Sequence, residues 1–104
     1  MTSGYAPHPE ALADLEDLHD YIAQDNSEAA DRVIADIFDT LRSLADFPHR
    51  GFLRPDLSSR PLPFAVVRDY VIVYAPGEKP LWVLAVIHGS RSPHTMASIL
   101  RGRG

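Results

Sequence analysis

Apolar residues recur at helical spacing in two stretches of the N-terminal half of this chain. The first series has steps of four, three and four and comprises Ala11, Leu15, Leu18 and Ile22. The second series keeps the same period and comprises Ala30, Ile34, Ile37, Leu41 and Leu44. Pro9 suits a first helical turn, Asn26 or Ser27 can cap the second helix, and Pro48 ends it. We therefore predict a helical hairpin whose second helix runs from about residue 28 to about residue 46.

The polar residues between these apolar positions carry many carboxylates. In the first helix Asp14, Glu16, Asp17 and Asp20 fall outside the apolar series. We assign them to a solvated helix face, because carboxylates are rarely buried without a partner.

The C-terminal half shows the pattern of strands. Residues 71–74 and 82–87 are continuous β-branched and aromatic runs, which predict central strands covered on at least one face. Residues 64–67 predict a third strand, and residues 4–7 suit a short edge strand. Four prolines in residues 48–63 indicate a loop or a poorly formed strand, and Ser92 and Pro93 open a short terminal helix ending near residue 100.

Helices segregated from a meander of strands imply the α+β class. The predicted architecture is an N-terminal helical hairpin on a small, mainly antiparallel sheet of three to four strands, followed by a short C-terminal helix. A length of 104 residues with 45% hydrophobic residues fits one domain, 1–104. No apolar run approaches the ~18 residues that span a bilayer, and no signal-peptide pattern opens the chain, so a cytoplasmic protein without membrane contact is expected.

Charge is distributed unevenly along the chain. Residues 1–46 hold two arginines and eleven acids, whereas residues 47–104 hold eight basic residues and three acids, which gives −9 and +5 for the two segments. This asymmetry predicts an acidic face and a basic face on one domain. Nine of the ten basic residues are arginine, whose planar donor fork suits carboxylates and phosphates.

The basic half supplies our candidate binding residues, which are Arg50, Arg54, Arg60, Arg68, His88 and Arg91. The first three lie in the proline-rich segment, as either solvated loop charges or a basic rim facing a partner. For His88 we expect a hydrogen bond to a loop carbonyl that fixes the end of the last strand, and for Gly89 a positive φ where that strand turns. Arg91 suits either a surface ion pair or a partner contact.

The residue pattern gives little support to a metal site, a cofactor site or a surface that stacks on nucleic-acid bases. The five histidines include no pair at metal-ligand spacing, and no glycine-rich phosphate cradle is present, so we expect no metal and no cofactor. Tyr70, Tyr74 and Trp82 are flanked by valine, isoleucine and leucine, which favours packing in the sheet over stacking on nucleic-acid bases.

Five short motifs then suggest a family. They are Ala11-x-x-Asp14-Leu15-x-x-Leu18-x-x-Tyr21-Ile22-Ala23, Ala29-Ala30-x-x-Val33, Leu44-x-x-Phe47-Pro48-x-x-Gly51, Tyr70-Val71-Ile72-Val73-Tyr74 and Val86-x-His88-Gly89-x-Arg91. With these motifs, in this order, the chain resembles the ParE/RelE superfamily of type II toxins, often labelled plasmid-stabilisation proteins. The resemblance implies a cognate antitoxin as partner. The antitoxin would wrap the toxin with a segment that folds on binding, and the tail, residues 92–104, would fold with it or alone.

The superfamily contains two activities. RelE-like members cleave messenger RNA on the ribosome, and ParE-like members inhibit DNA gyrase without a chemical step of their own. RelE-like nucleases usually carry an arginine after the first tyrosine of their Tyr-Arg-x-x-Tyr strand, where this chain has Val71 after Tyr70. They also tend to carry a polar catalytic group about six residues beyond the last-strand arginine, where this chain has Met96 and Ala97.

These differences favour a gyrase-directed toxin with no catalytic residues. If the chain is instead a nuclease, His88, Arg91 and Arg68 would carry the chemistry, because cleavage needs a proton acceptor and cations for the phosphate. An inactive member retained for complex formation is the third alternative. No DNA-reading motif is visible, so operator binding would come from the antitoxin.

Overall fold

The computed structural model describes residues 4–58, 60–77 and 79–103. Its three helices are α1 (Pro9–Ala23), α2 (Ser27–Asp46) and α3 (Pro93–Arg101). Its five strands are β1 (Tyr5–Pro7), β2 (Phe52–Leu53), β3 (Pro63–Val67), β4 (Tyr70–Ala75) and β5 (Leu81–His88). The α+β class, the N-terminal hairpin and the C-terminal helix are confirmed. Among the described residues, no helix is both long and apolar enough to cross a membrane.

Local capping sets where the helices begin. Pro9 occupies the first turn of α1, and the His8 side chain accepts a hydrogen bond from the Glu10 amide at 3.1 Å. In α2 the Asn26 side chain accepts from the Ala29 amide at 3.0 Å, which satisfies one of the free amides of its first turn. The α2 boundaries agree with the predicted range to within one residue at its start.

The sheet has the strand order β1-β5-β4-β3-β2. The strands β3, β4 and β5 form an antiparallel meander, β2 pairs antiparallel with β3, and β1 pairs parallel with β5. The predicted count of three to four strands is therefore too low. The edge strand expected at residues 4–7 is present as β1, whereas β2 spans only two residues and is too short to show an alternating pattern in the sequence.

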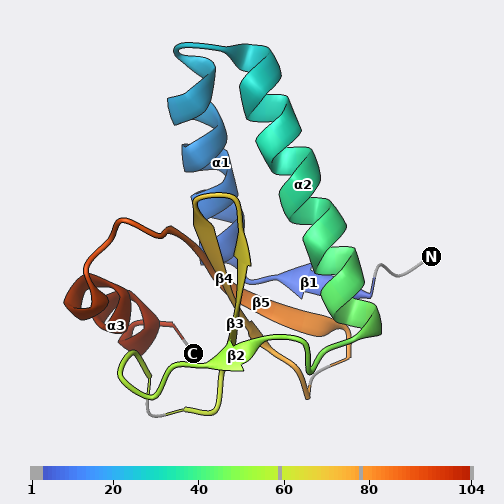
Figure 1. Cartoon of the computed structure of the whole chain (residues 1–104), viewed down its shortest axis with the longest axis vertical. Coiled ribbons are helices and arrows are strands. Elements are labelled where there is room, and N and C mark those ends of the chain that lie inside the picture. The colour runs from blue at the N-terminus through green and yellow to red at the C-terminus, as the bar shows by residue number, and fades with distance from the viewer. Residues whose placement is uncertain (1–3, 59, 78, 104) are drawn as a thin grey trace.

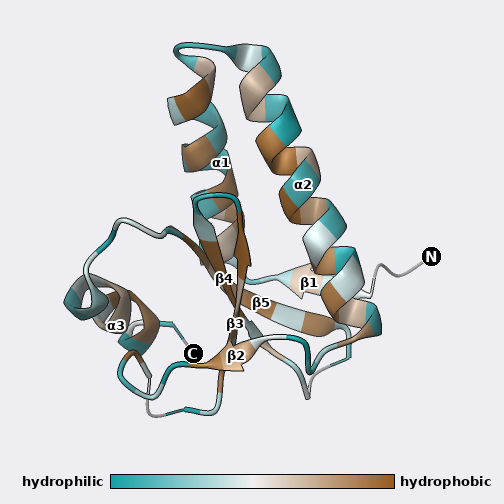
Figure 2. Ribbon diagram, viewed as in Figure 1, coloured by the Kyte–Doolittle hydropathy of each residue, from teal (hydrophilic) through white to brown (hydrophobic). Residues whose placement is uncertain are grey.

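Both faces of the sheet are covered (Figure 1). The hairpin of α1 and α2 packs on one face, where Ile37, Leu41, Ile72 and Tyr74 are fully buried. On the other face α3 packs with Leu57 and Leu62 in a second cluster of apolar side chains. Figure 2 shows hydrophobic residues along β4 and β5 and hydrophilic residues at the turn of the hairpin. Coverage on both faces explains the continuous apolar runs of these strands.

A bulge interrupts the pairing of β4 with β5. Val73 lies opposite Ala85 and Tyr74 lies opposite Val83, which leaves Leu84 as an extra residue in β5. Leu84 and Ala85 therefore both belong to the cluster beside α3, and Val86 returns to the cluster beneath the hairpin. The bulge thus determines which side chains at the end of β5 face α1.

Candidate partner-binding site

Three of the six candidate binding residues form surface contacts with other side chains of this chain. The Arg68 side chain donates to the Asp36 carboxylate of α2 at 2.6 Å. Arg54 forms a two-pronged pair with Asp56 at 3.0 and 2.7 Å, which raises the pKa of Arg54 and lowers the pKa of Asp56. Arg50 donates to the Ser43 hydroxyl. These contacts are exposed, so each contributes little stability, but each fixes a guanidinium close to the body of the domain.

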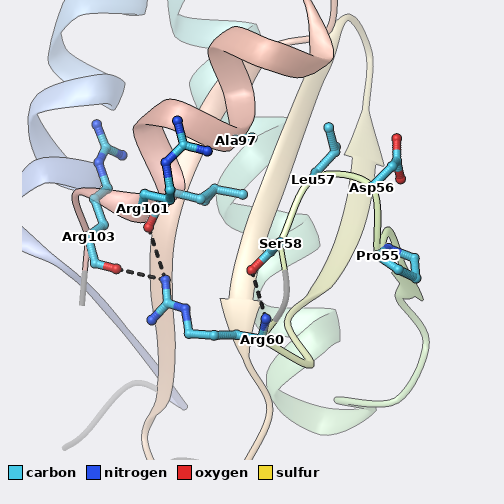
Figure 3. Close-up of a pocket in the computed structure, with 9 residues that line it drawn as sticks. Pro55, Asp56, Leu57, Ser58, Arg60, Ala97, Arg101 and Arg103 are labelled. Carbon is cyan, nitrogen blue, oxygen red and sulfur yellow. Dashed lines mark hydrogen bonds between the residues drawn. The ribbon is translucent and has the colours of Figure 1, made fainter.

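Arg60 holds the C-terminal segment. Its guanidinium donates to the Leu100 carbonyl at 3.1 Å and to the Arg103 carbonyl at 2.7 Å, and its amide donates to the Ser58 hydroxyl at 3.1 Å (Figure 3). Arg60 lines a groove of about 540 Å³ between residues 55–58 and α3. The carbonyls at a helix C-terminus have no partner within the helix, and a cation there is favourable. Arg60 is therefore a cap for α3, a role that neither sequence interpretation included.

His88 and Gly89 differ from the expectations in detail. The Nδ1 of His88 accepts from the Ser90 amide at 3.0 Å, so His88 does fix the strand end but binds an amide there instead of a carbonyl. Gly89 has no positive φ. Its amide donates to the Asp69 carbonyl at 2.7 Å, and a Cβ at residue 89 would lie 3.2 Å from that oxygen. Close backbone approach, and not an unusual dihedral, is what favours glycine here.

A positive φ occurs at Arg68 and not at Gly89, where we expected it. With a φ of 53°, Arg68 is the one non-glycine residue with a positive φ in the described ranges. It lies in the tight turn between β3 and β4, where hairpin geometry demands such values. Arg68 pairs with α2 and does not join His88 and Arg91.

A second groove, of about 680 Å³, runs past the end of β5. Of the six candidates only His88 and Arg91 line it, together with Asp17 and Tyr21 of α1 and Tyr70 of β4. Arg91 is exposed, and no hydrogen bond or ion pair engages its side chain in the part of the chain that the structure describes. We call this the Arg91 groove.

Two tyrosines add donors to the Arg91 groove. Tyr70 is 9% exposed and belongs to the core, as predicted, and its ring meets the His88 ring edge-on at 5.2 Å. Burial, and to a lesser degree Asp69 and Tyr21, raise the pKa of Tyr70, which keeps its hydroxyl protonated at neutral pH. Tyr21 is 74% exposed. The groove thus offers a cation, an imidazole and hydrogen-bond donors on aromatic rings, a combination common in protein interfaces.

One polar cluster was missed by the sequence interpretation. Asp14 accepts two hydrogen bonds from the Arg103 guanidinium, at 2.5 and 3.0 Å, and one from the Val86 amide at 3.0 Å. Arg103 also donates to Leu84 O at 3.1 Å and to Glu10 at 3.0 Å. We name this cluster the Asp14–Arg103 clasp. The hydrogen bonds to Asp14 are the main reason that the pKa of Arg103 is raised.

The assignment of Asp14 to a solvated face was therefore wrong. Its side chain is 19% exposed and that of Arg103 is 11% exposed, the least exposed ion pair among the described residues. Helical spacing contained a signal, because Asp14 lies three residues after Ala11 and four before Leu18, on the same face as both. A carboxylate on an apolar face requires a partner, and that partner lies at the opposite end of the chain.

Comparison with protein families agrees with this geometry. A family model described as "ParE toxin of type II toxin-antitoxin system, parDE" matches residues 5–93. The match includes the hairpin, all five strands, His88 and Arg91, and it ends before Arg103. No curated protein matches the chain.

Proposed function

Because the chain belongs to the family of ParE toxins of type II toxin–antitoxin systems, we propose that it inhibits DNA gyrase by binding to it, and that a cognate antitoxin prevents this. The family itself gives a toxin role and an antitoxin partner. The gyrase target, the absence of a chemical step and the residues that make contact are our proposal.

The observation that carries the proposed site is the free side chain of Arg91. The other candidate arginines each bind a carboxylate, a hydroxyl or backbone carbonyls of this chain, so each of these guanidinium groups is already engaged in part. Arg91 borders a groove of about 680 Å³ with exposed Tyr21 beside it. Arginine and tyrosine are enriched among the residues that dominate binding energies. We assign gyrase contact to the Arg91 groove.

Binding without cleavage is supported by the positions that differ from RelE-like nucleases. Val71 is half-buried and packs towards the α3 side of the sheet, and Met96 is buried in the same cluster. Ala97 lines the groove near Arg60 and not the Arg91 groove. None of the three side chains can transfer a proton, so these positions add no acid or base to His88.

The test is induction of the chain alone in bacteria, with DNA topology and messenger RNA integrity followed in the same samples. We expect gyrase-trapped, cleaved DNA and intact messages. Arg91→Ala should abolish this effect, whereas Arg32→Ala, an exposed arginine of α2 that also lacks a described partner, should leave it unchanged. Equal toxicity of both variants would contradict the site, and normal supercoiling in poisoned cells would contradict the target.

A ribosome-dependent nuclease remains the second candidate, because His88 and Arg91 line one groove with Tyr70. The Tyr70 hydroxyl could donate the proton that a leaving oxygen needs, but burial raises its pKa and so makes it a weaker acid than an ordinary tyrosine. Under this hypothesis messages would be cut before supercoiling changes, and His88→Ala would stop the cutting. No growth defect at all would indicate an inactive member of the family.

For the antitoxin we propose the outer surface at β2. Phe47, Phe52 and Leu53 are 62%, 46% and 58% exposed, so three large apolar side chains are left exposed within one short stretch of the chain. Arg50 and Arg54 flank β2 in the sequence, so an antitoxin helix with an apolar face and acidic residues along its rim would fit both features.

This surface can be tested separately from toxicity. Leu53→Ser should weaken antitoxin binding measured by calorimetry and should leave the toxicity of the chain alone intact. The matched control is Leu12→Ser, since Leu12 is 45% exposed on α1. If both variants bind the antitoxin as tightly as the original chain, the antitoxin lies elsewhere.

A further inference from the structure

Hydrogen bonds join α1 and the residue before it to β5 at two places. The His8 amide donates to the Val83 carbonyl at 2.7 Å, where the pairing of β1 with β5 ends. Further along the helix, the Asp14 carboxylate accepts from the Val86 amide at 3.0 Å. Among the described residues, no hydrogen bond or ion pair joins residues 15–23 of α1 to residues 87–91. The bond between Asp14 and Val86 is therefore the last polar contact between this helix and this strand.

The Arg91 groove opens directly beyond this bond. One wall of the groove belongs to α1 and includes Asp17 and Tyr21. The other wall belongs to the end of β5 and the turn after it, and includes His88 and Arg91. Both partners of the hydrogen bond line the same groove. The bond thus joins the two walls at one end of the groove and sets their separation there.

The Asp14–Arg103 clasp holds the Asp14 carboxylate in the orientation that this bond needs. The Arg103 guanidinium donates to both oxygens of the carboxylate, at 2.5 and 3.0 Å. A two-pronged contact of this kind fixes the geometry of a carboxylate as well as pairing its charge. The backbone of Arg103 is itself fastened, because Arg60 binds its carbonyl (Figure 3). The oxygen that accepts from Val86 is therefore directed at β5 before any partner binds.

We propose that Asp14 is a positioning residue for the Arg91 groove, and that its bond to the Val86 amide holds the two walls at the separation at which one partner contacts both. This inference rests on the proposed function of the groove. Tyr21 and Arg91 lie on different walls, and side chains of these two types often dominate binding energies. A partner that engages both binds more tightly when the walls are already correctly spaced, because association then does not have to order them.

The first test compares growth inhibition by Asp14→Ala and Arg103→Gln, each full chain induced alone in bacteria over a range of protein levels. Asp14→Ala removes the bond to the Val86 amide, whereas Arg103→Gln removes the ion pair and leaves that bond in place. We expect Asp14→Ala to need about tenfold more protein for the same inhibition, the factor that corresponds to one hydrogen bond to a charged group. Arg103→Gln should need a clearly smaller increase. An equal loss in both variants overturns the proposal, since it would assign the effect to the C-terminal tail.

Two control variants separate this inference from the function on which it rests and from general loss of stability. If Arg91→Ala is as toxic as the original chain, the proposed site is wrong and the role of Asp14 is refuted with it. If Arg91→Ala is harmless and Asp14→Ala is fully toxic, the groove stands and only the positioning role is refuted. Tyr74→Phe removes two hydrogen bonds from a residue that does not line the groove, so it should remain toxic. A loss of toxicity in Tyr74→Phe as large as that in Asp14→Ala would assign both losses to stability and contradict the proposal.

A second measurement reports the spacing of the walls without any partner. The chain contains no cysteine, so spin labels can be attached through Glu16→Cys and Asp69→Cys alone. Glu16 is exposed on α1, and Asp69 is exposed in a turn held to the end of β5, because its carbonyl accepts from the Gly89 amide at 2.7 Å. Pulsed electron paramagnetic resonance should give a narrow distribution of distances between the labels in the original sequence and in Arg103→Gln, and a broader one in Asp14→Ala. An unchanged distribution in a non-toxic Asp14→Ala would show that Asp14 contacts the partner directly, and would overturn the positioning role.

Discussion

Replacing Tyr74 by phenylalanine removes a single hydroxyl group from the centre of the fold. Tyr74 is 0% exposed and lies in β4 beneath the hairpin. Its hydroxyl donates to the Pro48 carbonyl at 2.8 Å and accepts from the Gly51 amide at 3.0 Å. These two bonds tie the segment between α2 and β2 to the sheet, although that segment has no regular structure of its own.

The expected fall in the free energy of unfolding follows from the loss of these two hydrogen bonds. Phenylalanine retains the ring and its packing, so the change costs no cavity larger than one oxygen atom. A typical hydrogen bond contributes about 1 kcal/mol net, and a polar group left buried without a partner costs about 1–3 kcal/mol. Pro48 and Gly51 are only half-buried, so water can reach them in part. We therefore expect Tyr74→Phe to lower the free energy of unfolding by about 1.5 kcal/mol.

The assay is equilibrium unfolding in urea together with thermal unfolding. For a domain of this size, 1.5 kcal/mol corresponds to a fall in Tm of roughly 6–12 °C. Tyr70→Phe is the control, because Tyr70 is also a buried tyrosine of β4 but its hydroxyl has no hydrogen bond among the described residues. Its stability should change by less than about 0.5 kcal/mol.

A difference of less than about 0.5 kcal/mol between the two variants would refute this reasoning, since it would mean that the hydroxyl of Tyr74 contributes no more than that of Tyr70. An equally large loss in both would mean that removing a hydroxyl from either tyrosine of β4 has the same cost, whether or not the two hydrogen bonds of Tyr74 are present. In either case the loop that carries Arg50 would have to be held by other contacts.

Two further predictions concern the same loop and the hairpin. Gly51→Ala places a Cβ 2.9 Å from the Phe64 carbonyl and closer still to the Tyr74 hydroxyl, so it should destabilise the chain by about 1–3 kcal/mol in urea unfolding. Gly77→Ala is the control and should not destabilise the chain, because a Cβ at residue 77 would have no atom within 4 Å. Hydrogen bonding to Asp31 raises the pKa of His19 above 6.5, so protonated His19 links the two helices below that pH and the link is lost as pH rises through the raised pKa. An NMR titration should show this raised pKa and its return towards 6.5 in Asp31→Asn; an unchanged value would contradict it.

The elements that the sequence predicted well are those that repeat a period over many residues. Both helices of the hairpin and the strands at residues 71–74 and 82–87 have long apolar runs or stripes, so their existence and order could be read directly. The short edge strand expected at residues 4–7 is confirmed by β1, but β2 fell in a segment expected as a loop or a poorly formed strand, because two residues contain no period. The bulge at Leu84 is equally invisible, since every residue from Leu81 to Ile87 is apolar and no polar side chain marks the change of face.

Polar contacts were harder to predict because their partners are distant in sequence. Asp14 and Arg103 are 89 residues apart, and Arg60 reaches carbonyls 40 and 43 residues away. The local pattern assigned Asp14 to solvent, left Arg60 as either a solvated loop charge or a partner contact, and gave Arg103 no role. Only the fold shows which of these charges meet.

The uneven charge of the chain takes on a different meaning once these contacts are known. An acidic N-terminal half and a basic C-terminal half were expected to form two opposed faces. Instead, Arg68 binds Asp36 and Arg103 binds Asp14 and Glu10, so cations of the second half neutralise acids of the first. The opposite charges of the two halves are therefore partly paired within the fold, and these ion pairs join the hairpin to the sheet and to the C-terminal tail. What this pairing leaves for a partner is smaller and more specific, and the Arg91 side chain, which lines the Arg91 groove, has no hydrogen bond or ion pair in the described chain.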